Sequence, residues 1–161
     1  MDMKQFLSFC LNAGIYAIPI ESVESVVQVE EFIDLPKTSP YVKGLLNLRG
    51  EAVIVVDLKK KFGIPDKAVN ASPSVIVMNI ESKAEADHEP RHFRIGVITD
   101  SVNEVIDLNE DIEDIGDTGI TIDRSLIQGI GKRENKFIII LRPEAMFDEE
   151  EKRAADSSLT A

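Results

Sequence analysis

Two histidines four residues apart are the first residues whose spacing suggests chemistry. His88 and His92 flank Pro90, and three acidic residues lie between positions 85 and 89. On a helix this spacing would place both imidazoles on one face, where they could bind a metal ion. Because Pro90 interrupts the segment and its other residues are polar, we expect a solvated loop over 82–91 and no metal site.

An acidic cluster that begins at Asp107 matches part of a calcium-binding loop. Asp107, Asn109 and Asp111 occupy positions one, three and five of that motif. Position six is Ile112, where the loop needs glycine, and position twelve is Thr118, which has no carboxylate. We therefore interpret the cluster as an acidic surface.

Nucleophilic and phosphate-binding motifs do not occur in the sequence. The single cysteine, Cys10, lies in an apolar run and is predicted to be a buried hydrophobic residue. No Gly-x-Ser-x-Gly motif is present, and the stretch 44–50 lacks the Gly-Lys-Ser/Thr of a phosphate loop. The run 59–61 of three lysines is interpreted as the solvated face of a short helix. We therefore expect no enzyme activity and no cofactor.

The remaining candidate is the sequence Asn47-Leu48-Arg49-Gly50, which lies between two apolar runs. Gly50 can adopt a positive φ and allow a tight chain reversal. The resulting hairpin would present Arg49 on a rigid support, and the planar fork of arginine suits carboxylates because it can bind both oxygens. A surface arginine beside a turn glycine explains the same residues equally well, so spacing alone leaves both interpretations open.

Short apolar runs carry these candidates. They are rich in Val, Ile and Phe and are bounded by Gly, Asn, Asp and Pro, a pattern typical of strands in small barrels or a sandwich. The expected strands are Gln5–Leu11, Ile15–Ile18, Val26–Ile33, Leu45–Leu48, Ala52–Val56, Ser74–Ile80, Phe93–Ile98, Val105–Leu108, Leu126–Gly131 and Lys136–Leu141. Brief helices are expected at Ile20–Ser25, Leu58–Phe62, Ser101–Glu104 and Pro143–Phe147.

An internal repeat organises these runs, because residues of the first half match residues of the second half in the same order. The matches are Val23 with Val102 and Val26 with Val105 at an offset of 79, Gly14-Ile15 with Gly96-Val97 at 82, and Gly44 with Gly129, Val53 with Ile138, Val56 with Leu141 and Phe62 with Phe147 at 85. We interpret them as two copies of one five-stranded unit. Each copy is too small to bury much apolar surface alone, so the two should pack together.

One domain is therefore predicted over residues 1–147. Its two units occupy approximately 15–65 and 74–141, with exchange of strands between them allowed. The segment 148–161 is polar without an apolar period and is expected to be a frayed tail.

Composition narrows the classes of function. The chain has 161 residues, of which 43% are hydrophobic and 29% charged, as in an ordinary soluble domain. Its net charge of −11 disfavours nucleic acid and anionic membrane surfaces as partners. No apolar stretch approaches the roughly 20 residues of a membrane helix, and the first apolar run is too short for a signal peptide. We expect a cytoplasmic protein without membrane insertion.

The region 41–63 resembles the CheW family of chemotaxis coupling proteins. The first part, Tyr41-Val42-Lys43-Gly44-Leu45-Leu46-Asn47-Leu48-Arg49-Gly50, and the second, Val53-Ile54-Val55-Val56-Asp57-Leu58-Lys59-Lys60-Lys61-Phe62-Gly63, are similar to the family's "KG-x-x-NLRG … VDL-x-x-x-FG" run. Phe6-Leu7-Ser8-Phe9, Tyr16-Ala17-Ile18 and Leu35-Pro36 add to the resemblance. It extends from about Gln5 to Phe147, and the second half matches more in order than in identity.

This resemblance implies an all-β fold of two five-stranded SH3-like β-barrels that share a hydrophobic core and are connected by short helices. It also implies a non-enzymatic adaptor that couples the cytoplasmic tips of chemoreceptors to the histidine kinase CheA in signalling arrays. The regulatory domain of CheA, which has a similar fold, would be one partner. The helical tip of a receptor would be the other, bound in a groove between the barrels.

Within this scheme we predict receptor contacts at Arg49, Asn47, Lys43, Gly44 and Val23. The guanidinium of Arg49 would bind a carboxylate or carbonyl on the receptor helix, while nearby apolar residues cover its apolar face. A competing hypothesis makes Arg49 a structural residue that holds the two barrels together through a buried pair with an acidic residue.

For the kinase we predict contacts at Val27 and Val29, which lie in a strand flanked by charged residues. Edges of small β units readily pair or pack with similar units. The alternative is that both valines belong to the core.

Two departures from the family pattern bear on partner choice. Ser25 stands where the family often has an acidic residue, and the loop 82–91 is long for the family. The competing functions are a metal-dependent regulator that uses His88 and His92, and a kinase-regulatory module that associates with itself.

Overall fold

The computed structural model describes residues 4–12, 14–28, 31–34, 40–65, 73–82, 91–108, 124–147 and 155. The strands in this part of the chain are β1 (Lys4–Leu11), β2 (Gly14–Pro19), β3 (Val23–Gln28), β4 (Val42–Leu48), β5 (Glu51–Asp57), β6 (Ser74–Ser82), β7 (Arg91–Thr99), β8 (Ser101–Leu108), β9 (Ile127–Arg133) and β10 (Lys136–Leu141). Four short helical turns accompany them: η1 (Ile20–Ser22), α1 (Leu58–Lys61) and η2 (Arg124–Leu126) lie between strands, and η3 (Pro143–Ala145) follows β10. No helix among these residues is long and apolar enough to cross a membrane.

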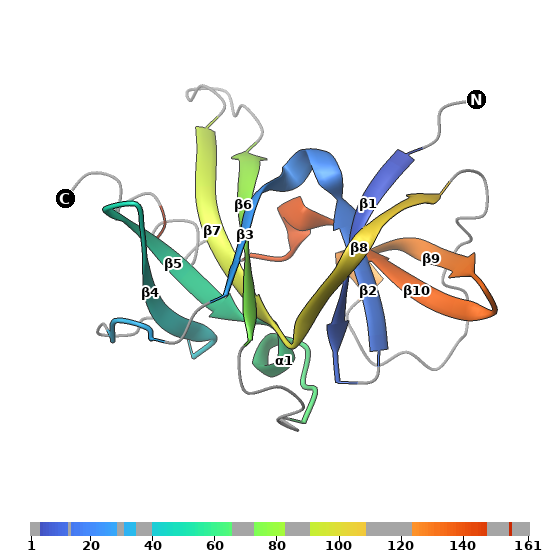
Figure 1. Ribbon diagram of the computed structural model, residues 1–161, viewed down its shortest axis with the longest axis horizontal. Helices are drawn as coiled ribbons and strands as arrows, with labels where there is room; N and C mark the ends of the chain where they lie inside the picture. The colour runs from blue at the N-terminus through green and yellow to red at the C-terminus, as the bar shows by residue number, and fades with distance from the viewer. Residues whose placement is uncertain are drawn as a thin grey trace.

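The strands form two five-stranded sheets that lie side by side (Figure 1). The β1 barrel has the strand order β8-β1-β2-β10-β9, and the β3 barrel has the order β3-β6-β7-β5-β4. The expected all-β fold of two SH3-like barrels with short connecting helices is confirmed. Several element boundaries differ from expectation by a few residues, and two of the differences change the type of element. β3 begins at Val23 because η1 ends at Ser22, and 101–104 is part of β8 because it pairs with β1.

The two barrels correspond position by position. In the β3 barrel Val42 pairs with Val56, and in the β1 barrel Ile127 pairs with Leu141, both 85 residues further along. A β-bulge follows Val42 and Ile127 alike. The backbone bond from Asp57 N to Tyr41 O is repeated from Arg142 N to Leu126 O, each at 2.8 Å. The offset of 85 is therefore a structural equivalence as well as a sequence pattern.

The offset of 79 is also structural, whereas the offset of 82 is not. Val26 pairs with Ile76 on β6, and Val105 pairs with Leu7 on β1, so β3 and β8 occupy equivalent edges. Gly96 pairs with Val55 in one barrel, and Ala17 pairs with Ile140 in the other. The counterpart of Gly96 is thus Ala17, at an offset of 79, and the match of Gly14 with Gly96 was a chance alignment.

Strand exchange joins the two copies. Along the chain β1–β5 form the first copy and β6–β10 the second, but each barrel takes two strands from one copy and three from the other. β2 of the expected unit 15–65 lies in the β1 barrel, and β6 and β7 of the expected unit 74–141 lie in the β3 barrel. Neither copy can complete a barrel without the other.

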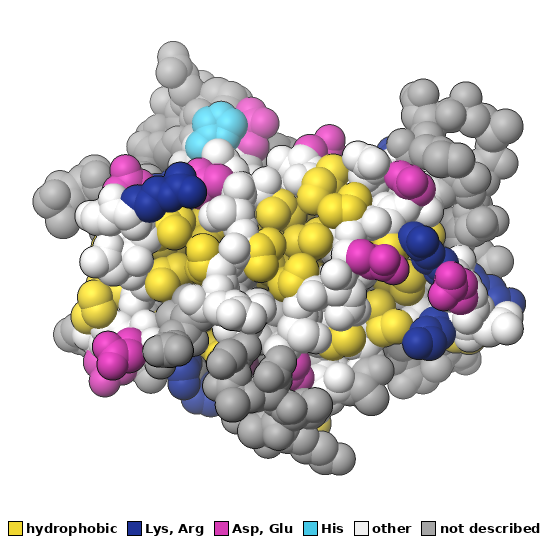
Figure 2. All heavy atoms as spheres, viewed as in Figure 1, with side chains coloured by type: hydrophobic (Ala, Val, Ile, Leu, Met, Phe, Trp, Pro, Cys, Tyr) yellow, Lys and Arg dark blue, Asp and Glu magenta, His cyan; other side chains and the backbone are white. Residues whose placement is uncertain are grey.

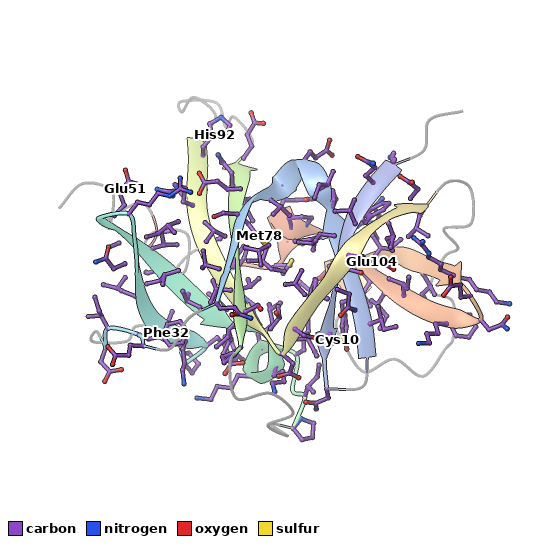
Figure 3. All side chains as sticks on the ribbon, in the orientation of Figure 1. Cys10, Phe32, Glu51, Met78, His92 and Glu104 are labelled. Carbon is purple, nitrogen blue, oxygen red and sulfur yellow. The ribbon has the colours of Figure 1, made fainter. Side chains whose placement is uncertain are left out.

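Three apolar clusters hold this arrangement together. One fills each barrel, with Phe6 and Ile140 in the β1 barrel and Val53 and Val75 in the β3 barrel. The third, here called the central cluster, combines side chains of both barrels with those of α1. Met78, which Figure 3 labels, belongs to it and is fully buried between the barrels. Figure 2 shows apolar side chains reaching the surface across the middle of this face. The expected shared core is therefore present.

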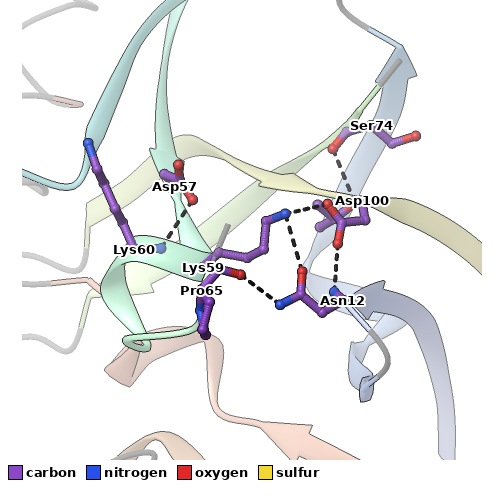
Figure 4. Close-up of polar contacts among 8 residues, drawn as sticks. Asn12, Asp57, Lys59, Lys60, Pro65, Ser74 and Asp100 are labelled. Atoms are coloured by element: carbon purple, nitrogen blue, oxygen red, sulfur yellow. Dashed lines mark hydrogen bonds and ion pairs between the residues drawn. The ribbon is translucent and has the colours of Figure 1, made fainter. Parts of the chain in front are cut away.

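A buried polar clasp lies where the chain passes from β7 to β8 (Figure 4). Lys59 Nζ of α1 is 2.7 Å from Asp100 Oδ1, and the two side chains are 10% and 11% exposed. The Asn12 backbone N donates to Asp100 Oδ2 at 2.6 Å, and Asn12 Nδ2 donates to Pro65 O at 2.7 Å. Asn12 directly follows β1 of one barrel, and Lys59 lies in α1, which directly follows β5 of the other barrel. The clasp therefore joins the two barrels.

The predicted solvated face of three lysines is wrong for Lys59. Lys60 is exposed, but Lys59 is buried because Asp100 supplies the opposite charge from the distant connection between β7 and β8. Lys61 is half-buried, with its Nζ 5.7 Å from the ring centroid of Tyr41. A run of like charges therefore has three different environments within one turn of helix.

Candidate functional site

The β4–β5 hairpin has the conformation that its sequence predicts. Leu48 pairs with Glu51, which leaves Arg49-Gly50 as a two-residue loop. Gly50 has a φ of 86°, as expected, and Arg49 also has a positive φ, 51°. Asn47 Oδ1 accepts a hydrogen bond from Gly50 N at 3.0 Å and braces the turn. Both central residues with positive φ define the tight turn that matches the twist of a hairpin.

Arg49 is exposed at the tip of this hairpin. The tip lies at the end of the β3 barrel that points away from the β1 barrel, beside Glu51 in Figure 3. Within the described ranges no residue forms an ion pair or hydrogen bond with its side chain. This position argues against the competing hypothesis that Arg49 holds the barrels together through a buried pair.

Arg94 of β7, which sequence reasoning missed, pairs with two carboxylates of its own barrel and does not join the two barrels. Its Nε and Nη2 donate to Glu24 Oε2 on β3 at 3.0 and 2.8 Å, and its Nη1 donates to Glu51 Oε2 on β5. The hydrogen bond with Glu24 raises the pKa of Arg94 above its usual value, although partial burial opposes the shift. The signal in the sequence was a charge inside the apolar run Phe93-Arg94-Ile95-Gly96-Val97.

Val23 lies close to this ion-pair group, because it precedes Glu24 on β3. It is half-buried and packs against the central cluster. Its counterpart Val102 on β8 is also half-buried and packs against the same cluster. β3 and β8 are edge strands of the two sheets, so equivalent valines of both barrels pack at the border of the central cluster.

Lys43 and Gly44 lie at the other end of β4. Lys43 precedes Arg49 by six positions, which corresponds to about 20 Å along a strand. Lys43 is exposed, with its Nζ 6.0 Å from the ring centroid of Phe32. Gly44 is buried, and a Cβ there would lie 2.7 Å from Ile33 O, which bridges β4 at Leu45. The structure therefore places Asn47, Arg49 and Val23 at one end of the barrel and the other two predicted residues at the opposite end.

Val27 points into the β3 barrel. It is half-buried and packs against the apolar cluster there, whereas its neighbour Val26 is 42% exposed. The offset of 79 pairs Val27 with Ile106, which is buried in the β1 barrel. Val29 lies outside the described residues. Ser25, at the position that is often acidic in the family, has a buried Oγ with no hydrogen-bond partner among the described residues.

Metal-ligating side chains do not gather in the part of the chain that the structure describes. The described residues contain no cluster of three or more His, Cys, Asp or Glu side chains arranged to hold a metal ion. His92 is exposed on β7, and His88 lies outside the described part of the chain. Most of the acidic segment after Asp107 lies outside it as well. Cys10 is half-buried, with its Sγ 3.3 Å from Asn103 Nδ2, and is thus less buried than predicted.

Comparison with known proteins gives a consistent result. A family model described as a CheW-like domain matches residues 5–151. The chemotaxis protein CheW of Bacillus subtilis is 27% identical over 153 residues, which cover 94% of this chain and 92% of the relative. CheW of Helicobacter pylori is 28% identical over 144 residues, which cover 89% and 81%.

A solved structure agrees with these relatives. The crystal structure of the scaffolding protein TtCheW from Thermoanaerobacter tengcongensis matches with a TM-score of 0.76 and 31% identity, over 94% of this chain and 92% of that one. Fold, internal repeat and hairpin sequence thus agree with the family match, and the chain belongs to the family of CheW-like domain proteins.

Proposed function

We propose that this chain is a non-enzymatic cytoplasmic adaptor that couples chemoreceptor tips to the regulatory domain of the histidine kinase CheA. The observation that carries the proposal is Arg49, an exposed cation at a two-residue turn where its φ is 51°. A left-handed backbone conformation costs a side-chain-bearing residue about 1–2 kcal/mol relative to the right-handed one. Arg49 has no ion-pair or hydrogen-bond partner for its side chain among the described residues, and the proposal assigns that partner to the receptor.

The receptor partner is a helix with an apolar face and acidic or carbonyl groups beside it. Val23 and Val102 offer apolar surface on the two edge strands that border the central cluster. Arg49 adds a planar cation whose backbone is already fixed, so less entropy is lost on binding. Asn47 contributes by bracing the turn. Lys43 would be reached only by a partner that extends along β4. Gly44 is buried and would act indirectly, because its lack of a side chain leaves room for the backbone of Ile33.

The kinase partner is assigned to β3. Val26 presents an exposed apolar surface on this edge strand, and Val27 supports it from inside the barrel. We propose that this strand docks the kinase regulatory domain, and Val29, outside the described residues, remains part of the proposed contact. An edge strand with an apolar outer side chain suits packing against a β unit of similar fold.

The experiment is a reconstitution with purified components. The full chain is mixed with a soluble receptor tip, with the kinase regulatory domain, and with both, and the complexes are measured by size-exclusion chromatography with light scattering. We expect a ternary complex in the presence of a metal chelator. A chain that binds neither partner contradicts the proposal. A chain that only associates with itself, or that binds only with added metal through His88 and His92, would favour the competing functions.

A further inference from the structure

The β4–β5 hairpin and β3 approach each other without being neighbours in a sheet. In the strand order β3-β6-β7-β5-β4, two strands separate β3 from β5. Backbone pairing therefore does not fix the hairpin tip relative to β3. The side chain of Arg94 spans this distance, because it starts on β7 and reaches Glu24 on β3 and Glu51 on β5.

We propose that Arg94 is a positioning residue that locks the Arg49 hairpin against β3 and so presets the receptor-binding surface. The inference rests on the proposed function, since it names a determinant of that surface. Glu24 follows Val23 directly, and Glu51 lies two residues after Arg49. One guanidinium thus connects the apolar part of the surface with its cationic part.

The face on which Arg94 lies explains how it can do this. Gly96, two residues further along β7, faces the interior of the β3 barrel, where a Cβ would meet Val75 and Val55. Arg94 is on the same side of the strand, so its stem lies at the open end of that barrel with a side-chain exposure of 22%. The guanidinium bridges the open end of the barrel from β3 to β5.

The β1 barrel provides a natural comparison, because the offsets identify the counterpart of each member of the group. They are Ile15 for Arg94 and Asn103 for Glu24 at 79, and Lys136 for Glu51 at 85. Ile15 packs against the interior cluster of that barrel and can form no ion pair. The Arg94 ion pairs are therefore not needed to build this type of barrel, and they occur in the barrel that carries Arg49.

The solvent exposure of the two glutamates indicates that the Arg94 ion pairs contribute little to global stability. Glu24 is 37% exposed and Glu51 is 62% exposed, so water screens both pairs and their contribution to folding is small. A weak interaction is enough to hold a binding group in place, because the Arg94 ion pairs need only restrict the motion of the hairpin. They do not need to stabilise the whole fold. Losing them should therefore be visible in receptor binding and in local hairpin dynamics more than in global stability.

The test compares Arg94→Met, Arg49→Ala and the double variant in the full-length protein, with a soluble receptor tip as the ligand. Methionine keeps an apolar stem over the barrel mouth and removes both ion pairs. We expect Arg94→Met to weaken tip binding by about 3- to 10-fold and to add less than about 2-fold in the Arg49→Ala background. Lys132→Met, which removes an exposed cation from the equivalent hairpin, should leave tip binding unchanged.

A second measurement does not depend on the receptor. Amide hydrogen exchange at Gly50 and Glu51 should be faster in Arg94→Met than in the wild type, and unchanged in Lys132→Met. Additive losses in the double variant, or unchanged exchange at the hairpin, would overturn the inference. If the wild type fails to bind the tip, the proposed function fails, and the exchange measurement alone decides whether Arg94 positions the hairpin.

Discussion

The β4–β5 and β9–β10 hairpins share one backbone plan and differ in what they present. Their first strands alternate buried and exposed residues in the same way, and both loops consist of two residues with positive φ. The loop is Arg49-Gly50 in the β3 barrel and Glu134-Asn135 in the β1 barrel, so the charge at the tip is reversed.

The difference teaches that inward and outward positions of the repeat obey separate constraints. Inward positions keep apolar residues, as with Val53 and Ile138, because each barrel must fill its interior. Outward positions differ between the two copies. Arg49 is equivalent to Glu134, and Ala52 is equivalent to Phe137, which is 68% exposed. Outward residues that differ between the two copies are therefore the better candidates for binding than the inward residues that both copies share.

The largest expected effect comes from the clasp that makes the two barrels one unit. Lys59→Ala leaves Asp100 buried without its cation, which should lower the free energy of unfolding by roughly 3–5 kcal/mol in a urea titration. Lys60→Ala, on the exposed side of the same helix, should change it by less than about 0.5 kcal/mol. Equal effects of the two variants would show that the clasp is not needed to join the barrels.

The next effect tests the equivalence of Val27 with Ile106. Val27→Asp would place a carboxylate against the apolar interior of the β3 barrel and should destabilise the protein by roughly 2–3 kcal/mol. Val26→Asp, at an exposed position, should leave stability nearly unchanged and reduce binding of the kinase regulatory domain. If Val27→Asp preserves both the fold and kinase binding, the assignment of this strand to the kinase is wrong.

A smaller effect compares the two tips directly. Arg49→Ala should weaken receptor-tip binding by roughly 1–3 kcal/mol, as at an interface hot spot, with little change in stability. Glu134→Ala, at the equivalent position of the other barrel, should leave tip affinity unchanged. Isothermal titration and urea melts on both variants separate the two quantities. A large loss of stability with unchanged receptor affinity would identify Arg49 as structural.

The smallest effect concerns the backbone at the same two positions. Glycine relieves the cost of a positive φ, so Arg49→Gly and Glu134→Gly should each raise the free energy of unfolding by roughly 0.5–1 kcal/mol. Arg49→Gly alone should also lose receptor affinity. Thermal and urea melts measure the first effect. Destabilisation by either substitution would contradict the assignment of strain to these turns.

Much of the fold could be predicted from local pattern. The strands follow from runs of β-branched residues, and the hairpin follows from Asn47 and Gly50, because turn chemistry acts over a few residues. The segment 101–104 was mistaken for a helix because its pairing partner, β1, is some 90 residues away in the chain. Local preference cannot register such a partner.

The candidate site likewise has features that follow from local sequence and features that depend on contacts between distant residues. The sequence by itself determined that two copies of one unit exist and that Arg49 sits at a turn, since both depend on residue order and spacing. Tertiary structure alone decided which copy completes which barrel, and that Lys59 is buried against Asp100. It also decided that Arg94, and not Arg49, joins two carboxylates. The physical reason is that these contacts depend on which distant strands become neighbours, and that is settled only when both barrels bury their apolar faces together.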